Sequence, residues 1–182
     1  MRYKTAGFTL IETIVGLVVL AISFTLLTNM IYPLVTESAD QSHQIRAAEL
    51  GQSFLNEISA RAFDDNSDMS GGLLRCGETG ANDCSTVLTN EEGGDRTLFD
   101  DVDDYNGLDL SGSSIENSLG ESLDDLYLGY RVMITVCNDA GYDGTCDDST
   151  DTTLNHTAKL ITVTVTTPLD FSIRFATYKA NF

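Results

Sequence analysis

A run of 25 residues with a single charge limits what this chain can fold into more than any other feature. From Phe8 to Tyr32 the only charged side chain is Glu12. As a helix rising 1.5 Å per residue, such a run extends about 37 Å and can cross a bilayer core of about 30 Å. Arg2 and Lys4 precede the run, and no basic residue follows until Arg46. The positive-inside rule therefore predicts a cytoplasmic N-terminus and an exported remainder.

Glu12 is the unusual part of this run, because an ionised carboxylate inside a membrane helix is penalised by about 2.5–3.5 kcal/mol. A cleaved secretory signal would have a shorter apolar core and an A-x-A-like site, which the following NMIYPLVTESADQ does not offer. A plain signal anchor has the right length but leaves Glu12 unexplained. Cleavage between Gly7 and Phe8 instead frees a positively charged amine four residues from Glu12 and keeps the apolar helix.

The stretch AGFTLIETIVGLVVLAI resembles the class III signal of type IV pilins and pseudopilins. In that family a short basic leader ends in glycine, phenylalanine follows, and glutamate is fifth in the mature chain. The resemblance implies that a prepilin peptidase cuts after Gly7 and methylates the new amine of Phe8. It also implies other pilins or pseudopilins and a pilus assembly platform as partners, and inner membrane lipid around the helix before assembly.

Parallel packing of such helices gives Glu12 a role. Each N-terminus presents an ammonium group and the positive end of a helix dipole. Glu12 of one subunit can then pair with the amine of a neighbour displaced along the filament axis. A carboxylate that is costly alone in lipid becomes compensated on docking, so we expect the contact to favour assembly and to set the axial register.

Beyond the apolar run the chain keeps a helical pattern. Pro33 removes one helical hydrogen bond and is expected to kink the axis. Apolar residues then recur at spacings of three and four to about residue 62, with charged residues between them. We expect a leader over residues 1–7, a membrane and filament-core half over 8–33, an amphipathic half over 34–63 and an acidic head over 64–182.

Three C-terminal segments alternate in the strand period: residues 130–136, 159–167 and 171–178. Ile161, Val163 and Val165 share one predicted face, and threonines occupy the other. The turn TPLD between the last two segments predicts an antiparallel hairpin. The expected fold class is α+β, with a long kinked N-terminal helix packed on a C-terminal antiparallel sheet, as the pilin resemblance also implies.

The four cysteines form two close pairs, Cys76 with Cys84 and Cys137 with Cys146. Neither spacing is C-x-x-C and both histidines lie elsewhere, which argues against a zinc site. Four cysteines allow three connectivities, but local pairing closes the smallest loops. In an oxidising compartment we expect these two local disulfides, each contributing about 2–3 kcal/mol.

The net charge of −18 restricts the partners. Residues 64–151 hold 22 acidic side chains against only three arginines. A polyanionic surface repels nucleic acid and anionic lipid head groups, so the sequence predicts no nucleic-acid partner. The simpler explanation of these acidic side chains is a solvated exterior that keeps an exported protein soluble. Cation binding is the alternative.

Calcium is the cation that the segment DDVDDYNG would suit, because it offers hard oxygen ligands and a glycine for a sharp turn. The candidate ligands are Asp101, Asp103, Asp104 and Asn106. An EF-hand register fails here, since it places valine and serine where Asp and Glu are needed. A second group surrounds the later cysteine pair: Asn138, Asp139, Asp143, Asp147 and Asp148. Asp, Asn and Gly are also what turns prefer, so both groups have a plain structural explanation.

No catalytic constellation is present in the sequence: G-x-S-x-G, H-E-x-x-H and a phosphate-binding glycine loop are all missing. Adjacent carboxylates such as Asp124 and Asp125 are expected by chance among 28 acidic residues. We therefore expect that the protein is not an enzyme and needs no cofactor, calcium excepted.

The segments FDDVDDYNG and ITVTVTT…FATYKANF narrow the resemblance to minor pilins of the mannose-sensitive haemagglutinin pilus, of the MshD type. That implies a subunit which joins a pilus or initiates its assembly. The implied location is the inner membrane, with one crossing and a periplasmic C-terminal domain, followed by the pilus outside the cell. The alternatives are a minor pseudopilin of a type II secretion system and a pilus-borne module that binds a surface ligand or calcium.

Overall fold

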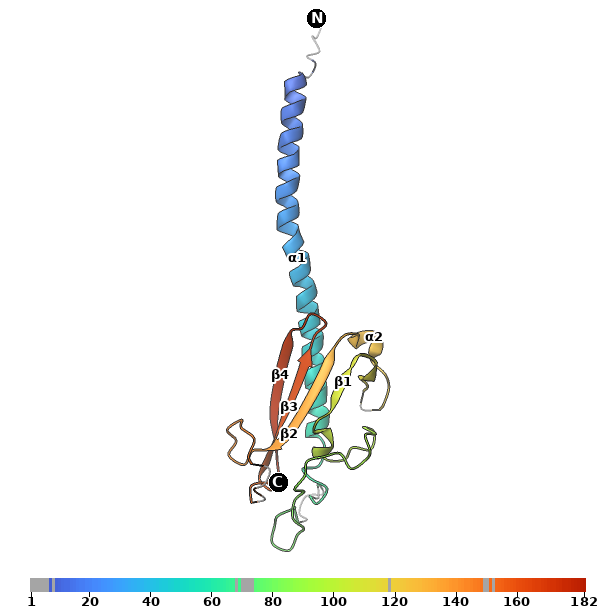
Figure 1. Ribbon diagram of the computed structural model, residues 1–182, viewed down its shortest axis with the longest axis vertical. Coiled ribbons are helices and arrows are strands. Elements are labelled where there is room, and N and C mark those ends of the chain that lie inside the picture. Colours follow the sequence, from blue (N-terminus) through green and yellow to red (C-terminus); the bar gives the residue numbers. More distant parts are fainter. Residues whose placement is uncertain are drawn as a thin grey trace, which may run out of the picture. The chain divides into compact units, whose positions relative to one another are not determined.

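The computed structural model describes residues 7, 9–67, 69, 74–117, 119–148, 151 and 153–182, with the backbone alone at residues 32–36 and 39. The chain divides into two compact units, Met1–Ser42 and His43–Phe182, and each is described by itself (Figure 1). The expected domain boundaries after residues 7, 33 and 63 follow processing and polarity instead of compactness, and they stay predictions.

The first unit consists of the N-terminal part of helix α1 (Leu10–Ser59). Within the described residues, Leu10–Ile31 is the one helical segment long and apolar enough to cross a membrane. The helix is continuous through residue 33, as expected for one long helix. The side chain of Pro33 lies outside what is described, and the kink expected there stays a prediction.

The second unit is built on a four-stranded antiparallel sheet with the strand order β1-β2-β3-β4 (Figure 1). The strands are β1 (Asp109–Ser111), β2 (Arg131–Asn138), β3 (Ala158–Thr166) and β4 (Ser172–Ala180). The predicted hairpin is confirmed, because Thr166 pairs with Ser172 across the turn of residues 167–170. The short helices are η1 (Asp103–Tyr105), η2 (Gly112–Ser114) and α2 (Asp124–Tyr127). With α1, they complete the α+β fold expected from the sequence.

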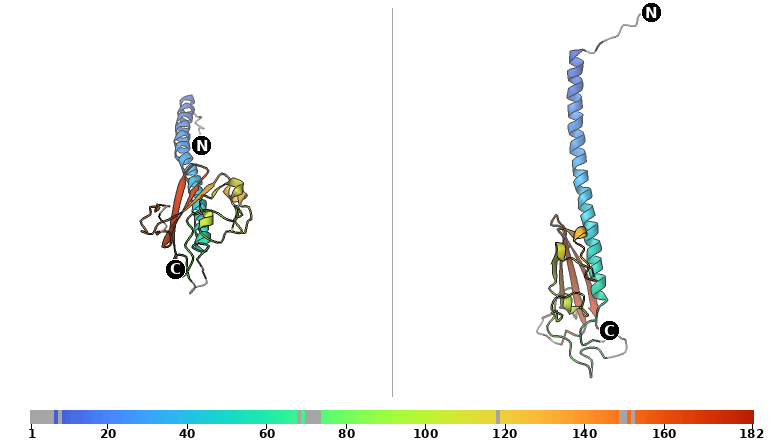
Figure 2. Two further views of the ribbon diagram at one scale, coloured as in Figure 1. Left: turned by 60° about the horizontal axis from the view of Figure 1, so that its bottom comes forward. Right: turned by 90° about the vertical axis from the view of Figure 1, so that its right-hand side faces the viewer.

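The core of the second unit lies between one face of the sheet and the part of α1 that follows Ser42 (Figure 2). On β3, Ile161, Val163 and Val165 are fully buried while the alternating threonines stay partly exposed, so the predicted faces are correct. The helix contributes residues at the predicted spacing: Ala47, Leu50, Phe54, Leu55 and Ile58. Burial of this apolar face fixes the helix on the sheet.

Gly51 permits a close approach between α1 and β4. A Cβ atom at this position would come within 2.4 Å of the Phe175 ring. Glycine weakens a helix interior by about 1 kcal/mol relative to alanine. Here the missing side chain makes room for the aromatic ring, which packs against the core.

Between α1 and β2 the described chain is mostly loops and turns, as the lack of periodicity predicted. We call the segment between α1 and η1, residues 60–102, the long loop. Ala62 forms a parallel β-bridge with Asp101, which brings the end of this loop back to the end of the helix. Disulfides join Cys76 to Cys84 and Cys137 to Cys146, the pairing expected from their spacing. The first bond is buried with Phe63 in a small separate cluster.

Candidate functional site

Glu12 lies in the first turn of α1, four residues after Phe8, where processing is expected. Thr9 caps this helix end, because its hydroxyl and its carbonyl oxygen both accept a hydrogen bond from the Glu12 N–H, at 3.3 and 3.1 Å. The Glu12 side chain is exposed, and among the described residues no cationic group makes an ion pair with it. A carboxylate so placed is available to a partner outside the chain. Gly7 is exposed, and Phe8 lies outside the described residues.

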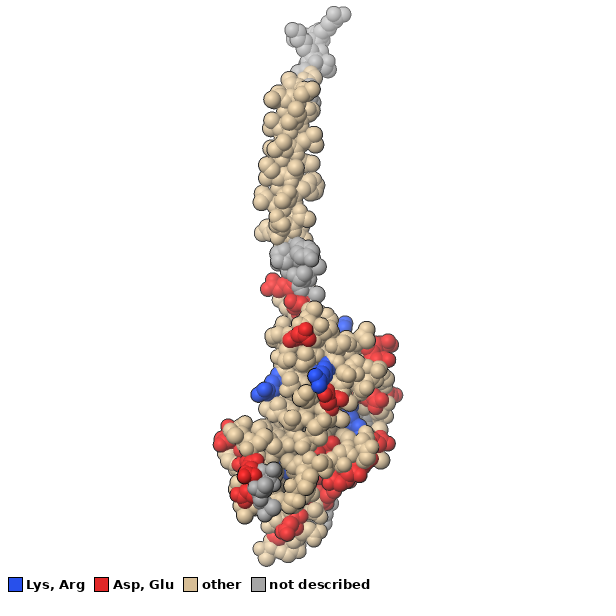
Figure 3. Space-filling model, in the orientation of Figure 1, with Lys and Arg blue, Asp and Glu red and all other residues tan. Residues whose placement is uncertain are grey.

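The apolar surface that follows Glu12 is not covered by any of the residues that the structure describes. No residue of Leu10–Ile31 is buried, and the face shown in Figure 3 carries no charged side chain along this segment. The hydroxyls within it are satisfied locally: Ser23 donates to the Val19 carbonyl at 2.8 Å, and Thr25 donates to that of Ala21 at 2.9 Å. Such bonds let hydroxyl side chains sit in lipid or between packed helices.

In the second unit, acidic side chains spread over the face shown in Figure 3. The least expected feature of the second unit lies in its interior, where Lys159 on β3 is fully buried. The Lys159 Nζ donates to Asp103 Oδ2 at 2.6 Å, to Asp64 Oδ2 at 3.4 Å and to the Phe63 carbonyl at 2.7 Å. It also lies 4.3 Å from the centroid of the Phe63 ring. We call Lys159, Asp64 and Asp103 the lysine cluster.

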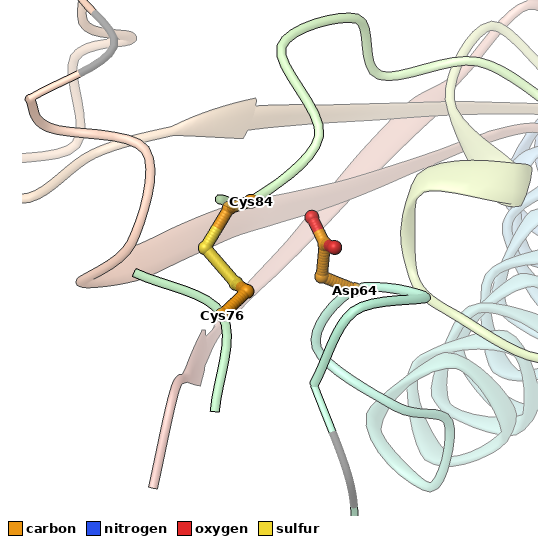
Figure 4. A group of neighbouring side chains, drawn as sticks. All are labelled: Asp64, Cys76 and Cys84. Carbon is orange, nitrogen blue, oxygen red and sulfur yellow. A yellow bond between two sulfur atoms is a disulfide. The ribbon is translucent and has the colours of Figure 1, made fainter. Parts of the chain in front are cut away.

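Figure 4 shows the Asp64 carboxylate beside the Cys76–Cys84 disulfide. These three residues have ligand-type atoms within 4.8 Å of one another. They do not suit a metal ion, because sulfur in a disulfide is not a thiolate and so lacks the charge that metal binding needs. The Asp64 oxygens are also engaged, since they accept N–H groups from Asn66 at 3.0 Å and Ser85 at 2.8 Å. The carboxylate therefore ties the segment after α1 to Ser85, which directly follows Cys84 of the disulfide.

The four calcium candidates from the sequence do not converge on one point. Asp103 is held by Lys159, and Asp101 Oδ1 accepts the N–H groups of Asp103 and Asp104 at 2.7 and 3.3 Å. The Asn106 amide donates to the Leu88 carbonyl and accepts the Val136 N–H, each at 2.9 Å. Asp103 Oδ1 and Asp104 Oδ1 are both buried without a hydrogen-bond donor among the described residues, but the other oxygen of Asp103 is held by Lys159.

Burial dominates the electrostatics of this segment. Desolvation raises the pKa of Asp103 to about 7, and the attraction of Lys159 opposes that rise. Desolvation likewise raises the pKa of Asp101 to about 6, again against Lys159. A buried lysine among buried acids is what keeps these carboxylates compatible with the interior.

The second acidic group, around Cys137–Cys146, is a self-contained turn. Asp139 Oδ2 accepts the Tyr178 hydroxyl at 2.7 Å and the Gly144 N–H at 2.8 Å. The hydrogen bond from Tyr178 holds the pKa of Asp139 below its usual value. Asp147 accepts the Ala140 N–H at 2.7 Å, and Asp143 accepts the Thr145 N–H at 2.9 Å. These carboxylates shape the loop, as expected of turn residues.

Sequence reasoning missed two polar networks. Lys159 could have been found from its position, because strand alternation puts it on the same face as Ile161, which is buried. The second network joins the long loop to α1: Arg96 pairs with Glu57, which also accepts the Tyr105 hydroxyl at 2.8 Å. No local pattern links residues 39 positions apart. Only the fold brings them together.

The comparison with known families places a motif at the N-terminus. Residues 2–28 match the family described as the prokaryotic N-terminal methylation motif. No curated protein and no solved structure matches the chain. The matched residues include Gly7, Phe8 and Glu12 and most of the exposed apolar helix.

Proposed function

We infer that this chain is the precursor of a type IV pilin or pseudopilin, a structural class of protein, because residues 2–28 match the N-terminal methylation motif. We propose that this chain is a minor type IV pilin, cut after Gly7 by a prepilin peptidase and methylated on Phe8. It then joins a pilus, or initiates its assembly, through the helix that begins at Leu10. The single observation that carries this proposal is the methylation motif at the start of a 22-residue uncovered apolar helix.

The exposed helix supports assembly on physical grounds. Apolar side chains along the whole of Leu10–Ile31 require lipid or neighbouring helices around them. Lipid covers the apolar surface but leaves the Glu12 carboxylate uncompensated. Parallel neighbours cover the same surface and also bring an N-terminal ammonium group to Glu12. The free energy of that pairing favours the filament over the dispersed membrane form.

The acidic second unit then becomes the part exposed outside the cytoplasm. Two disulfides suit an oxidising compartment, and a polyanionic exterior suits a solvated surface. The assignment to the MshD type is a finer proposal. It rests on the two short sequence segments alone.

The substitution Glu12→Gln tests the proposal. It keeps the helix and its size but removes the charge that meets the amine. We expect unchanged membrane insertion and a fall in filament incorporation of about ten- to a hundredfold, because a hydrogen bond to a charged group contributes about 1.5–3 kcal/mol. Immunoblots of sheared filaments and of membrane fractions measure both quantities.

Glu37→Gln is the matched control, since Glu37 is an exposed acid of the same helix outside the apolar run. Mass spectrometry of the sheared filaments should find a chain that begins at methylated Phe8. Normal incorporation of the Glu12 variant, or survival of residues 1–7 in the filament, would contradict the proposal. Retention in the cell envelope, with a secretion defect on deletion, would assign the chain to pseudopilins instead.

A further inference from the structure

Three carboxylates of the second unit gather where the long loop meets η1. An oxygen from each of Glu91, Glu92 and Asp104 lies within 4.8 Å of the others. Two oxygens that bind one Ca²⁺ at about 2.4 Å each can be at most about 4.8 Å apart. The spacing therefore allows one ion to contact all three. Acidic side chains often lie close together without an ion. The burial and hydrogen bonds of each carboxylate therefore decide whether the group is a plausible metal site.

Asp104 brings to this group a buried carboxylate with one unsatisfied oxygen. The residue is 2% exposed. Its Oδ2 accepts the N–H groups of Asp100 and Asp101 at 2.9 and 3.2 Å, which fixes the direction of the carboxylate. Its Oδ1 is buried and receives no hydrogen bond from the described residues, and the same holds for Oε2 of Glu92. A buried oxygen without a donor costs about 1–3 kcal/mol, and more when it is charged.

No basic side chain compensates these acids in the described part of the chain. The ion pairs found there are made by other carboxylates, including the two that Lys159 holds. Asp65 and Asp100 add further negative charge beside the group. Burial, followed by repulsion from Asp100, raises the pKa of Asp65.

The chain alone leaves these like charges close together. A divalent cation between them would relieve their repulsion with two positive charges. Asp104 Oδ1 and Glu92 Oε2, which have no hydrogen-bond partner among the described residues, are free to bind it.

We propose that Glu91, Glu92 and Asp104 bind one Ca²⁺ ion, with Asp65 and Asp100 strengthening the negative field around it. The oxygen-only ligand set suits a hard cation, since His and thiolate ligands are not in the group. Irregular loop ligands suit Ca²⁺ better than Mg²⁺, which demands near-ideal octahedral geometry. Water completes the coordination, because Ca²⁺ takes six to eight oxygens.

The ion would connect two segments of the second unit. Glu91 and Glu92 belong to the long loop, whereas Asp104 belongs to η1, whose Tyr105 is fully buried in the core. Binding therefore fixes the loop to the core. Extracellular modules that respond to surrounding calcium bind it with a Kd of about 0.1–1 mM.

Calcium titration of the full-length chain in detergent, after removal of metals with EDTA, tests the site. We expect one Ca²⁺ per chain by equilibrium dialysis at up to 5 mM free calcium, with a Kd of about 0.1–1 mM. The unfolding temperature should rise as calcium is added, because the ion binds only the folded form. Magnesium at the same concentration should give a smaller rise.

The double variant Glu92→Gln, Asp104→Asn should lose the stoichiometric ion and the temperature rise. In EDTA it should unfold at or above the parent temperature, because it removes two like charges that repel each other. This comparison separates loss of binding from loss of folding. The double variant Asp124→Asn, Asp125→Asn is the matched control, since it removes two exposed charges elsewhere and should bind calcium like the parent.

Three results would overturn the proposal: no saturable calcium binding up to 5 mM, equal loss of binding in the control variant, or tighter binding of magnesium. None of these results bears on the N-terminal helix, so the proposed function is tested separately.

Discussion

Asp103 and Asp104 are neighbours in η1, yet their carboxylates are compensated in opposite ways. Asp103 contacts the buried Lys159, which the fold itself supplies. Asp104 faces Glu91 and Glu92, and in the described chain no cation reaches it. In the first cluster a lysine offsets the negative charge, although Asp103 Oδ1 still receives no hydrogen bond from the described residues. The second has no such lysine, and the cation that we propose for it comes from outside the chain.

The comparison also applies to Glu12. Its carboxylate, like that of Asp104, has no cationic partner within the described chain, and the partner that we propose is the N-terminus of another subunit. Acids that lack an internal partner are therefore the positions where this protein is expected to depend on something else. The lysine cluster is the reference for acids whose charge is offset by a cation of the chain itself.

The largest effect is expected from Lys159→Met, which breaks the lysine cluster. It leaves Asp64 and Asp103 buried without a cation, so we expect a loss of about 3–5 kcal/mol in the free energy of unfolding. Urea unfolding of the full-length chain in detergent, at fixed calcium, measures it. Lys179→Met is the control. Lys179 pairs with Lys159 across β3 and β4, but among the described residues it donates to the Ser59 carbonyl alone, at 3.0 Å.

A double-mutant cycle sharpens this prediction. Asp103→Asn in the Lys159→Met background should recover part of the stability, since it removes one uncompensated charge. Equal stability of the Lys159 and Lys179 variants would show that the buried ion pair is not needed.

An intermediate effect is expected from the paired change Cys76→Ala, Cys84→Ala. This disulfide closes a short loop beside Asp64, so its loss should cost about 2–3 kcal/mol through the entropy of the unfolded chain. The matched change is Cys137→Ala, Cys146→Ala. It removes a disulfide whose cysteines are 9 positions apart in the sequence, against 8 for the first disulfide. The first pair should cost more, because it is buried beside the lysine cluster. A larger loss for the second pair, in the same urea assay, would contradict this order.

The smallest effect is expected from Arg131→Ala. Arg131 pairs with Asp109 across β1 and β2, and both side chains are exposed. Water and salt screen such a pair, so its loss should leave the urea midpoint within measurement error. A clear shift would mean that exposure does not separate structural ion pairs from incidental ones in this protein.

Local patterns predicted much of the architecture. The strand period placed Ile161, Val163 and Val165 on the buried face, because alternation along a strand is fixed by its geometry. The length of the apolar run predicted the first part of α1, and cysteine spacing predicted both disulfides. The motif around Gly7 and Phe8 was also visible without a fold, because it is a short linear sequence.

The candidate calcium site was predicted only in part. The sequence pointed to the segment that contains Asp104, because its composition suits Ca²⁺. It also selected Asp101, Asp103 and Asn106, whose side chains turned out to bind backbone groups and Lys159. It did not select Glu91 or Glu92, which approach Asp104 only through the path of the long loop.

The sequence by itself determined the length and polarity of the helix, the position of Glu12, the disulfide pairs and the faces of the strands. Each of these depends on residues close together along the chain. Only the tertiary structure decided that Asp103 meets a lysine while Asp104 meets carboxylates, and that Gly51 admits the Phe175 ring. The physical reason is that these contacts join distant segments, and packing of the whole second unit sets which side chains share one interior space.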